Sequence, residues 1–293
     1  MGVVFDPSDT RPLTEQIARL GFDAWADGYC ASVYREMAAW ATQYNTEAAW
    51  RMYAHHTTSP DSAPTPPDTE TPLTQWGRII TIPRAVLDND DQGFLRGIPY
   101  KVIGMMERTV AAQIRAVFEG HALADDGLPA FAVERGNVIE GSGAALTHEA
   151  ILDGLDHLRG TAVYLIVPPA LAQEAAQLLN ATVLIASGTG NSVDERYARD
   201  ARRSLMLRPI VQVVCEKSLR RPNEWFLLPT PDKSPVHVTT RRPEGLAFSF
   251  RRVQSKDAAE IETDAPLMMQ VGMEFSATPV ATRNAVKMVA HQS

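Results

Sequence analysis

The sequence predicts an α+β protein, with helices mainly in its first half and strands mainly in its second. The first 56 residues repeat aromatic and apolar side chains at spacings of three and four, which is typical of one helix face. A similar stripe predicts a long helix over residues 98–118. Strand-like runs between residues 210 and 250, and two more between 273 and 289, complete the pattern.

Composition limits the class of protein. A chain of 293 residues allows one large domain or two ordinary ones, and a 45% hydrophobic content excludes wholesale disorder. The net charge of −7 argues against a dedicated nucleic-acid binder. No apolar run approaches the roughly 20 residues of a membrane span, and the start of the chain does not resemble a signal peptide. Cys30 and Cys215 have no metal-site spacing, so we expect a reduced, intracellular protein.

The N-terminal helix carries an aromatic stripe that must be buried, either on its own chain or on a neighbouring copy. The stripe consists of Trp25, Tyr29, Val33, Met37, Trp40 and Tyr44. A proline-rich linker follows at residues 59–68, which can form neither helix nor central strand. Residues 73–87 then change to a strand-like or hairpin-like pattern, and residues 88–93 are typical of a turn.

The long helix is expected to begin near Pro99, which suits a first helical turn, and to end at Gly120. Gly104 inside it costs about 1 kcal/mol relative to alanine, so we expect another backbone or a bulky side chain close by. Thr147 caps the next predicted helix. The remaining predictions are a strand at 163–167, a helix after Pro168-Pro169, a polar loop at 186–204, and strands at 210–215, 225–228, 236–239 and 246–250.

The charges are distributed unevenly along the chain. Residues 196–256 carry fourteen Lys or Arg against five Asp or Glu. Four arginine pairs stand in this stretch: Arg202-Arg203, Arg220-Arg221, Arg241-Arg242 and Arg251-Arg252. Such a segment can bind phosphate, can bind the acidic surface of another copy, or can form a solvated face of mixed charge. The sequence leaves these alternatives open.

No catalytic, cofactor-binding or metal-ligating set emerges from the motifs. His148-Glu149 with His157 is not HExxH, because nine positions separate the two histidines. Asp88, Asp90 and Asp91 lack the EF-hand spacing and favour a helix cap. Residues 188–191 contain two glycines without the context of a phosphate-binding loop, and His55-His56 are expected to face solvent. The sequence therefore gives no positive reason to expect an enzyme.

Several strings resemble, in order, the major head subunits of Mu-like tailed phages, which belong to the HK97-fold capsid proteins. The similar region runs from about residue 72 to 182 and returns weakly at Val271–Phe275. It is carried by RIITIPR at 78–84, NDDQGF at 89–94, RGIPYKVIG at 96–104, Gly136-Asn137, GSGAALT at 141–147 and YLIVPPAL at 164–171.

The resemblance implies an HK97-like capsid fold with five parts. Residues 1–71 would form an N-terminal helical arm with its linker, and 72–92 an extended β-hairpin loop. Residues 93–146 would form the peripheral domain with its long spine helix, and 147–252 the axial domain. Residues 253–293 would return to the peripheral domain. Some relatives cross-link through a lysine on the hairpin, but residues 72–92 contain no lysine.

The function implied by this resemblance is structural. The chain would assemble with itself into hexameric and pentameric capsomers and a closed icosahedral head around double-stranded DNA. Portal, scaffold and decoration proteins are the further partners implied, with non-specific contact to packaged DNA and no membrane. The location would be the virion capsid, assembled in the bacterial cytoplasm, and no cofactor or metal is expected. An encapsulin-like compartment shell and a cytosolic α+β enzyme using His148 or the acidic turn are the alternatives.

Overall fold

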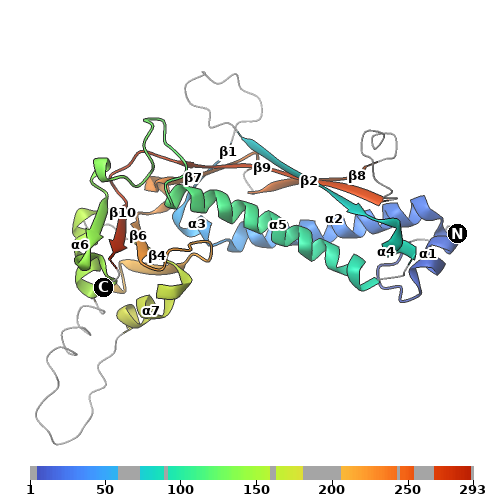
Figure 1. Ribbon diagram of the computed structural model, residues 1–293, viewed down its shortest axis with the longest axis horizontal. Helices are drawn as coiled ribbons and strands as arrows, with labels where there is room; N and C mark the ends of the chain where they lie inside the picture. Colours follow the sequence, from blue (N-terminus) through green and yellow to red (C-terminus); the bar gives the residue numbers. More distant parts are fainter. Residues whose placement is uncertain are drawn as a thin grey trace, which may run out of the picture. The chain divides into compact units, whose positions relative to one another are not determined.

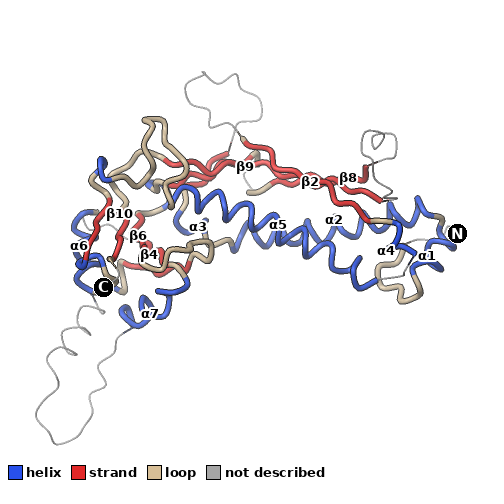
Figure 2. Tube along the Cα trace, viewed as in Figure 1, coloured by secondary structure: helices blue, strands red, loops and turns tan. Residues whose placement is uncertain are grey.

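The computed structural model describes residues 5–58, 73–88, 92–158, 163–180, 206–242, 245–253 and 267–291. The chain divides into two compact units, each assembled from three separate stretches. The first holds Met1–Glu47, Thr58–Val110 and Thr239–Ser276, and the second holds Ala48–Thr57, Ala111–Val238 and Ala277–Ser293. Helices and strands are mixed in both, which confirms the α+β class (Figure 2). The boundaries expected at residues 71, 146 and 252 do not coincide with those of the units.

The first unit is built on three antiparallel strands that belong to a five-stranded sheet. β9 (Leu267–Pro279) lies in the middle and pairs with β2 (Thr74–Ile82) on one side and with β8 (Ala247–Val253) on the other (Figure 1). The expected hairpin within residues 72–92 is therefore wrong: β2 pairs with β9, and the helix α4 (Arg84–Asp88) follows it. Periodicity identifies a strand but not a partner almost 200 residues away.

Helices cover one face of this sheet. They are α2 (Phe22–Glu47) and the first part of α5 (Gln92–Phe118), while α1 (Leu13–Leu20) packs against α2 and α4. The Tyr34 ring of α2 lies 5.5 Å from that of Phe248 on β8, and Trp40 Nε1 donates a 2.9 Å hydrogen bond to Glu107 of α5. On the aromatic stripe, Trp25, Tyr29, Val33 and Met37 are buried, so these four side chains belong to the core of their own unit.

Pro99 lies inside α5 rather than in its first turn, because the helix begins at Gln92. A proline in a helix interior leaves the carbonyl four residues earlier without its amide donor. Here that carbonyl belongs to Leu95, and it accepts a 2.8 Å hydrogen bond from the Tyr29 hydroxyl. The side chain from α2 thus replaces the missing backbone donor.

The expectation for Gly104 is also wrong within the chain. A Cβ atom there would meet only the Arg108 guanidinium, at 3.6 Å, which is ordinary van der Waals contact. Close packing occurs instead at Gly28 of α2, where a Cβ would lie 2.2 Å from Phe5 Cβ.

The second unit contains a mixed five-stranded sheet in the order β3-β10-β6-β4-β5. β10 is parallel to β3 and antiparallel to β6, and β4 is antiparallel to β6 and parallel to β5. The strands are β3 (Val138–Gly141), β4 (Val163–Val167), β5 (Val211–Cys215), β6 (Glu224–Leu228) and β10 (Val286–Ala290). The strands expected at 163–167, 210–215 and 225–228 are confirmed.

The helices α6 (His148–His157) and α7 (Ala172–Asn180) pack on this sheet through one buried cluster. The Thr147 side chain accepts a hydrogen bond from Ala150 N, which confirms it as the N-cap of α6. A Cβ on Gly154 would lie 2.3 Å from Leu227 Cδ1, so only glycine fits that close to the sheet. The unit also holds α3 (Trp50–Tyr53), β1 (His55–Thr58), β7 (Val236–Thr240) and short 3₁₀ turns at Val133–Arg135, Ser142–Ala144, Pro169–Leu171 and Pro231–Lys233.

Candidate assembly surfaces

The outer edge of β2 is the first surface with the properties of a contact site. β2 is nine residues long and stands at the end of its sheet in the strand order. It contains no proline or lysine, and Ile79 is 43% exposed. Natural proteins usually protect long, exposed sheet edges, because such an edge can pair with another chain. This edge is therefore suited to pairing with a second polypeptide.

The sheet face next to this edge is flat at its centre. Gly77, Gly272 and Ser249 stand opposite one another across β2, β9 and β8, so almost no side chain rises from that row. The rows on either side are held by polar contacts. Gln75 donates a 2.9 Å hydrogen bond to Glu274, and Arg251 donates a 2.7 Å hydrogen bond to Gln270. A flat face with a firm polar border allows another backbone to approach closely.

The loop of residues 121–137 in the second unit is a second exposed feature. The buried Asn137 side chain accepts from Ala132 N and donates to Ala130 O, and Arg135 donates to Asp126 and Pro129 O. These bonds fix a loop that exposes Leu123 by 60% and Val133 by 68%. Rigid loops that display apolar side chains are frequent contact sites.

Most of the described arginines in the four arginine pairs contact side chains of their own chain. Arg221 contacts Glu224 at 2.7 Å, Arg241 forms an ion pair with Glu274, and Arg252 lies 2.6 Å from Asp23 and 2.8 Å from Asp27. Arg202-Arg203 lie outside the described residues, while Arg220 and Arg242 are exposed. Exposed pairs of this kind contribute about 0–1 kcal/mol each.

The histidines considered as catalytic candidates are not brought together. His148 is buried, and its Nε2 lies 2.8 Å from the Leu178 carbonyl, whereas His157 is exposed at the end of α6. Asp90, Asp91 and residues 188–191 lie outside the described residues. Among the residues that are described, there is no group of three or more His, Cys, Asp or Glu placed to hold a metal ion.

His55 does not simply face solvent, because its ring lies 4.6 Å from that of His237 on the neighbouring strand β7. Burial, and then the nearby His55, lower the pKa of His237. Burial, and then Arg51 and His55, lower the pKa of His56. The His237 and His56 side chains are half-buried, and their lowered pKa values favour the neutral imidazole.

The two cysteines lack the features of nucleophiles. Burial raises the pKa of the Cys30 thiol to about 11. Burial, followed by the neighbouring Glu216, also raises the pKa of Cys215. Reactive cysteines have lowered pKa values, so neither thiol has the electrostatic setting that nucleophilic catalysis needs.

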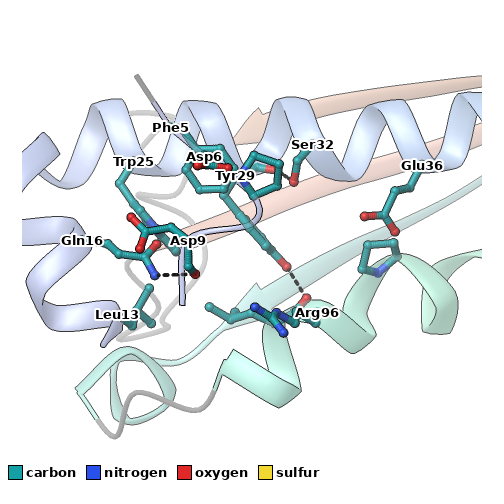
Figure 3. Close-up of a pocket in the computed structure, with 13 residues that line it drawn as sticks. Phe5, Asp6, Asp9, Leu13, Gln16, Trp25, Tyr29, Ser32, Glu36 and Arg96 are labelled. Carbon is teal, nitrogen blue, oxygen red and sulfur yellow. Dashed lines mark hydrogen bonds between the residues drawn. The ribbon is translucent and has the colours of Figure 1, made fainter. Parts of the chain in front are cut away.

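A cavity of about 90 Å³ lies between the N-terminal segment, α2 and the start of α5 (Figure 3). Trp25 and Tyr29 line it together with Asp6, Asp9 and Arg96. Two of its carboxylates are already engaged: Ser8 donates to Asp6, and the bond from the Arg11 guanidinium lowers the pKa of Asp9 to about 2. Pockets for small ligands usually measure about 300–1,000 Å³. This cavity has the size of a packing defect beside the Tyr29 hydrogen bond.

The fold and these surfaces agree with a comparison against protein families. Residues 67–278, which include β2, β8 and most of β9, match the family described as phage capsid protein. The chain belongs to this phage capsid family. No curated protein matches the sequence. None of the helices in the described ranges is long and apolar enough to span a membrane.

Solved structures place the capsid protein in the HK97-like fold. The holo-encapsulin complex of Synechococcus elongatus superposes with a TM-score of 0.51 at 12% identity, covering 84% of this chain and 90% of the other. The virus-like particle of Pyrococcus furiosus gives 0.49 at 10% identity, covering 87% and 98%. The capsid of the cyanophage P-SCSP1u gives 0.44 at 11% identity, covering 83% and 87%. At such identities the first of these comparisons supports the fold alone.

Sequence reasoning missed the two most distinctive surfaces. The free edge of β2 depends on its pairing with β9, which no local pattern reveals. A loop with short strands is what the pattern of residues 121–146 predicts, but the exposure of Leu123 and Val133 depends on the hydrogen bonds of Asn137 and Arg135.

Proposed function

We propose that this capsid protein is the major head subunit of a tailed phage related to the Mu-like phages. Many copies would form hexameric and pentameric capsomers and an icosahedral head around double-stranded DNA, assembled in the host cytoplasm. The observation that carries the proposal is the family match over residues 67–278, together with the unprotected edge of β2 inside the matched region. The role is structural rather than enzymatic, with portal, scaffold and decoration proteins as further partners.

The two units suggest which part of the chain would form each domain of a capsid subunit. The first unit, with the long sheet and most of α5, would act as the peripheral domain. The second unit, with the mixed sheet and the loop at 121–137, would act as the axial domain. The N-terminal helices would belong to the peripheral domain, because the Trp25 and Met37 side chains are part of its core.

Copies would meet through the edge and outer face of the β2–β9–β8 sheet. Backbone hydrogen bonds along β2 would supply affinity, and Ile79 would supply an apolar contact. Many moderate contacts of this kind suit a shell, because each is multiplied by the number of neighbours.

A substitution at Ile79 tests this surface. Ile79→Lys adds a charge to an exposed position, so we expect an unchanged melting temperature and a loss of rings and shells in negative-stain micrographs. Met206→Lys is the matched control, since it places the same charge at an exposed apolar position outside both candidate assembly surfaces. If Ile79→Lys forms normal particles, β2 is not part of the interface between copies. A stable 32 kDa monomer of the wild-type protein under all salt conditions would contradict the function itself.

An encapsulin-like compartment shell is the second candidate, and the TM-score of 0.51 with an encapsulin is the observation that favours it. The two candidates differ in what the shell contains. Particles purified from a phage-infected host should contain nuclease-protected DNA if the protein is a phage head subunit. Co-purification of one enzyme as stoichiometric cargo would favour the compartment instead.

A further inference from the structure

One face of α5 is exposed and basic along its length in the first unit. Arg96, Lys101 and Arg108 are all exposed, and Tyr100 is 71% exposed. At 100° per residue these four positions fall within about 140° of the helix circumference. The opposite side of α5 is apolar and buried through Ile98, Val102, Met106 and Val110, among others. The basic face is therefore a continuous strip rather than scattered charges.

The strip contains one acidic side chain, Glu107, which forms a hydrogen bond with Trp40. Glu107 lies between Arg96 and Tyr100 in helical projection, and its carboxylate accepts the Trp40 Nε1 hydrogen bond at 2.9 Å. Lys101 is held by the ring of Phe94, with 4.4 Å between Nζ and the ring centroid. With three basic residues against this one carboxylate, the strip carries a net positive charge in a chain whose total is −7.

The spacing of the basic residues suits a nucleic-acid backbone. A helix rises about 1.5 Å per residue, so Lys101 stands about 7.5 Å along the axis from Arg96, and Arg108 about 10.5 Å further. Successive phosphates on one DNA strand are about 3.4 Å apart along the duplex axis. The two intervals therefore correspond to roughly two and three phosphate steps.

The centre of the strip carries no bulky side chains, because two glycines lie there. Gly97 and Gly104 lie between the basic side chains, and a Cβ at Gly97 would come no closer than 3.9 Å to a neighbouring side chain, that of Lys101. A stable protein interface needs an apolar core. Apart from Tyr100, this strip offers none, so its chemistry fits phosphates better than it fits a second protein surface.

We propose that the basic strip Arg96–Lys101–Arg108 of α5 binds the phosphate backbone of double-stranded DNA without sequence preference. The inference rests on the proposed function, since a head subunit has DNA as its content. It goes further by naming the surface that meets the DNA. It also replaces the arginine pairs of residues 220–252 in this role, because Arg221, Arg241 and Arg252 are held by acidic residues of their own chain.

The test compares two triple variants for binding to a 30-base-pair DNA duplex across a salt series. Arg96→Gln/Lys101→Gln/Arg108→Gln removes the strip, and Lys217→Gln/Arg220→Gln/Lys233→Gln removes three exposed basic residues elsewhere. Three phosphate contacts contribute about 2.7 to the slope of log K against log salt, or about 40-fold in affinity between 50 and 200 mM. We expect the first variant to lose that part of the slope and the second to retain it. Equal slopes in the two variants would overturn the proposal.

A single position provides a second test that does not depend on removing side chains. Gly104→Glu places a carboxylate beside Arg108, whereas Gly104→Gln adds the same volume without charge. Both should fold, because the site has room and either residue favours helix over glycine. Only Gly104→Glu should weaken DNA binding, by at least several-fold at 50 mM salt. Equal weakening by both would mean that bulk rather than charge matters, and would overturn the proposal.

Particle formation is measured in parallel to separate this inference from the proposed function. If the variants form normal particles and bind DNA as well as wild type, the strip proposal fails and the capsid function stands. If the strip variant loses assembly while its DNA affinity is unchanged, the strip contacts a second copy and the proposal is wrong. A wild-type protein that binds DNA but never assembles would contradict the capsid function, while the DNA-binding proposal for the strip would stand.

Discussion

The Tyr29 hydroxyl donates a 2.8 Å hydrogen bond to the Leu95 carbonyl oxygen, the acceptor that Pro99 leaves without a backbone donor. Burial raises the pKa of Tyr29, so the hydroxyl remains protonated and continues to donate. One side chain thus joins α2 to α5 and satisfies a buried polar group at the point where α5 contains a proline.

The first prediction concerns this bond. Tyr29→Phe leaves the buried Leu95 carbonyl unsatisfied, which should lower the free energy of unfolding by about 1–3 kcal/mol. In a Pro99→Ala background the new amide restores the helical bond to Leu95, so the cost of Tyr29→Phe should shrink to below about 1 kcal/mol. Urea unfolding of the four proteins in this cycle measures the difference. Equal costs in both backgrounds would show that Tyr29 acts through packing alone.

The second prediction contrasts two helical glycines. Gly154→Ala brings a methyl group to 2.3 Å from Leu227 Cδ1 in a sealed core, and overpacking of this kind costs about 1–3 kcal/mol. Gly104→Ala meets only Arg108 at 3.6 Å, so it should stabilise α5 by about 1 kcal/mol. Melting temperatures should therefore move in opposite directions. A rise in both would indicate that α6 can shift away from the sheet.

The third prediction concerns a buried ion pair in the second unit. Lys287 Nζ lies 2.8 Å from Glu224 Oε2, with the two side chains 10% and 8% exposed. Lys287→Met should cost about 1–3 kcal/mol, since Glu224 Oε2 loses its partner while Arg221 still pairs with Oε1. Adding Glu224→Leu should recover a large part of that loss. Chemical unfolding measures both, and a double variant less stable than the single one would contradict the argument.

The fourth prediction concerns acid sensitivity. The folded pKa values of His237 and His56 lie below the ordinary value of about 6.5, so the unfolded chain binds more protons in that window. Stability should therefore fall as the pH drops from about 6.5 through the folded pKa values. The melting temperature should therefore decrease between pH 7 and 5.5.

His237→Gln should flatten this pH dependence, while His157→Gln, at an exposed position, should leave it unchanged. Differential scanning calorimetry at four pH values gives the comparison. An unaltered pH profile in His237→Gln would show that His237 does not cause the loss of stability in acid.

Local signals predicted most of the elements. The 3.6-residue period of α2 and α5, the Thr147 cap and the apolar run of β4 are properties of adjacent residues, and each appears in the structure. Start positions were less secure, since Pro99 is typical of a first turn and only the distant Tyr29 allows it inside α5.

Long-range organisation escaped prediction for a physical reason. β2 has a strand pattern, but the choice of β9 as its partner depends on the whole chain. The charge pattern identifies a basic segment, but it cannot show that Arg252 forms ion pairs with Asp23 and Asp27, more than 220 residues earlier. The basic strip of α5 was visible in the spacing of Arg96, Lys101 and Arg108, but only the burial of the opposite face separates a surface strip from a core position.

The order in which the strands are synthesised determines when the two sheets can form during translation. β9 is the central strand of the first sheet and β10 lies between β3 and β6 in the second, yet they follow all the other strands that the structure describes. A nascent polypeptide therefore exposes β2 and β8 without their shared partner until residues 267–276 have left the exit tunnel. Neither sheet can close before β9 and β10 have emerged from the ribosome. Incomplete chains would lack a formed sheet face, so premature polymerisation on polysomes would be suppressed by connectivity alone.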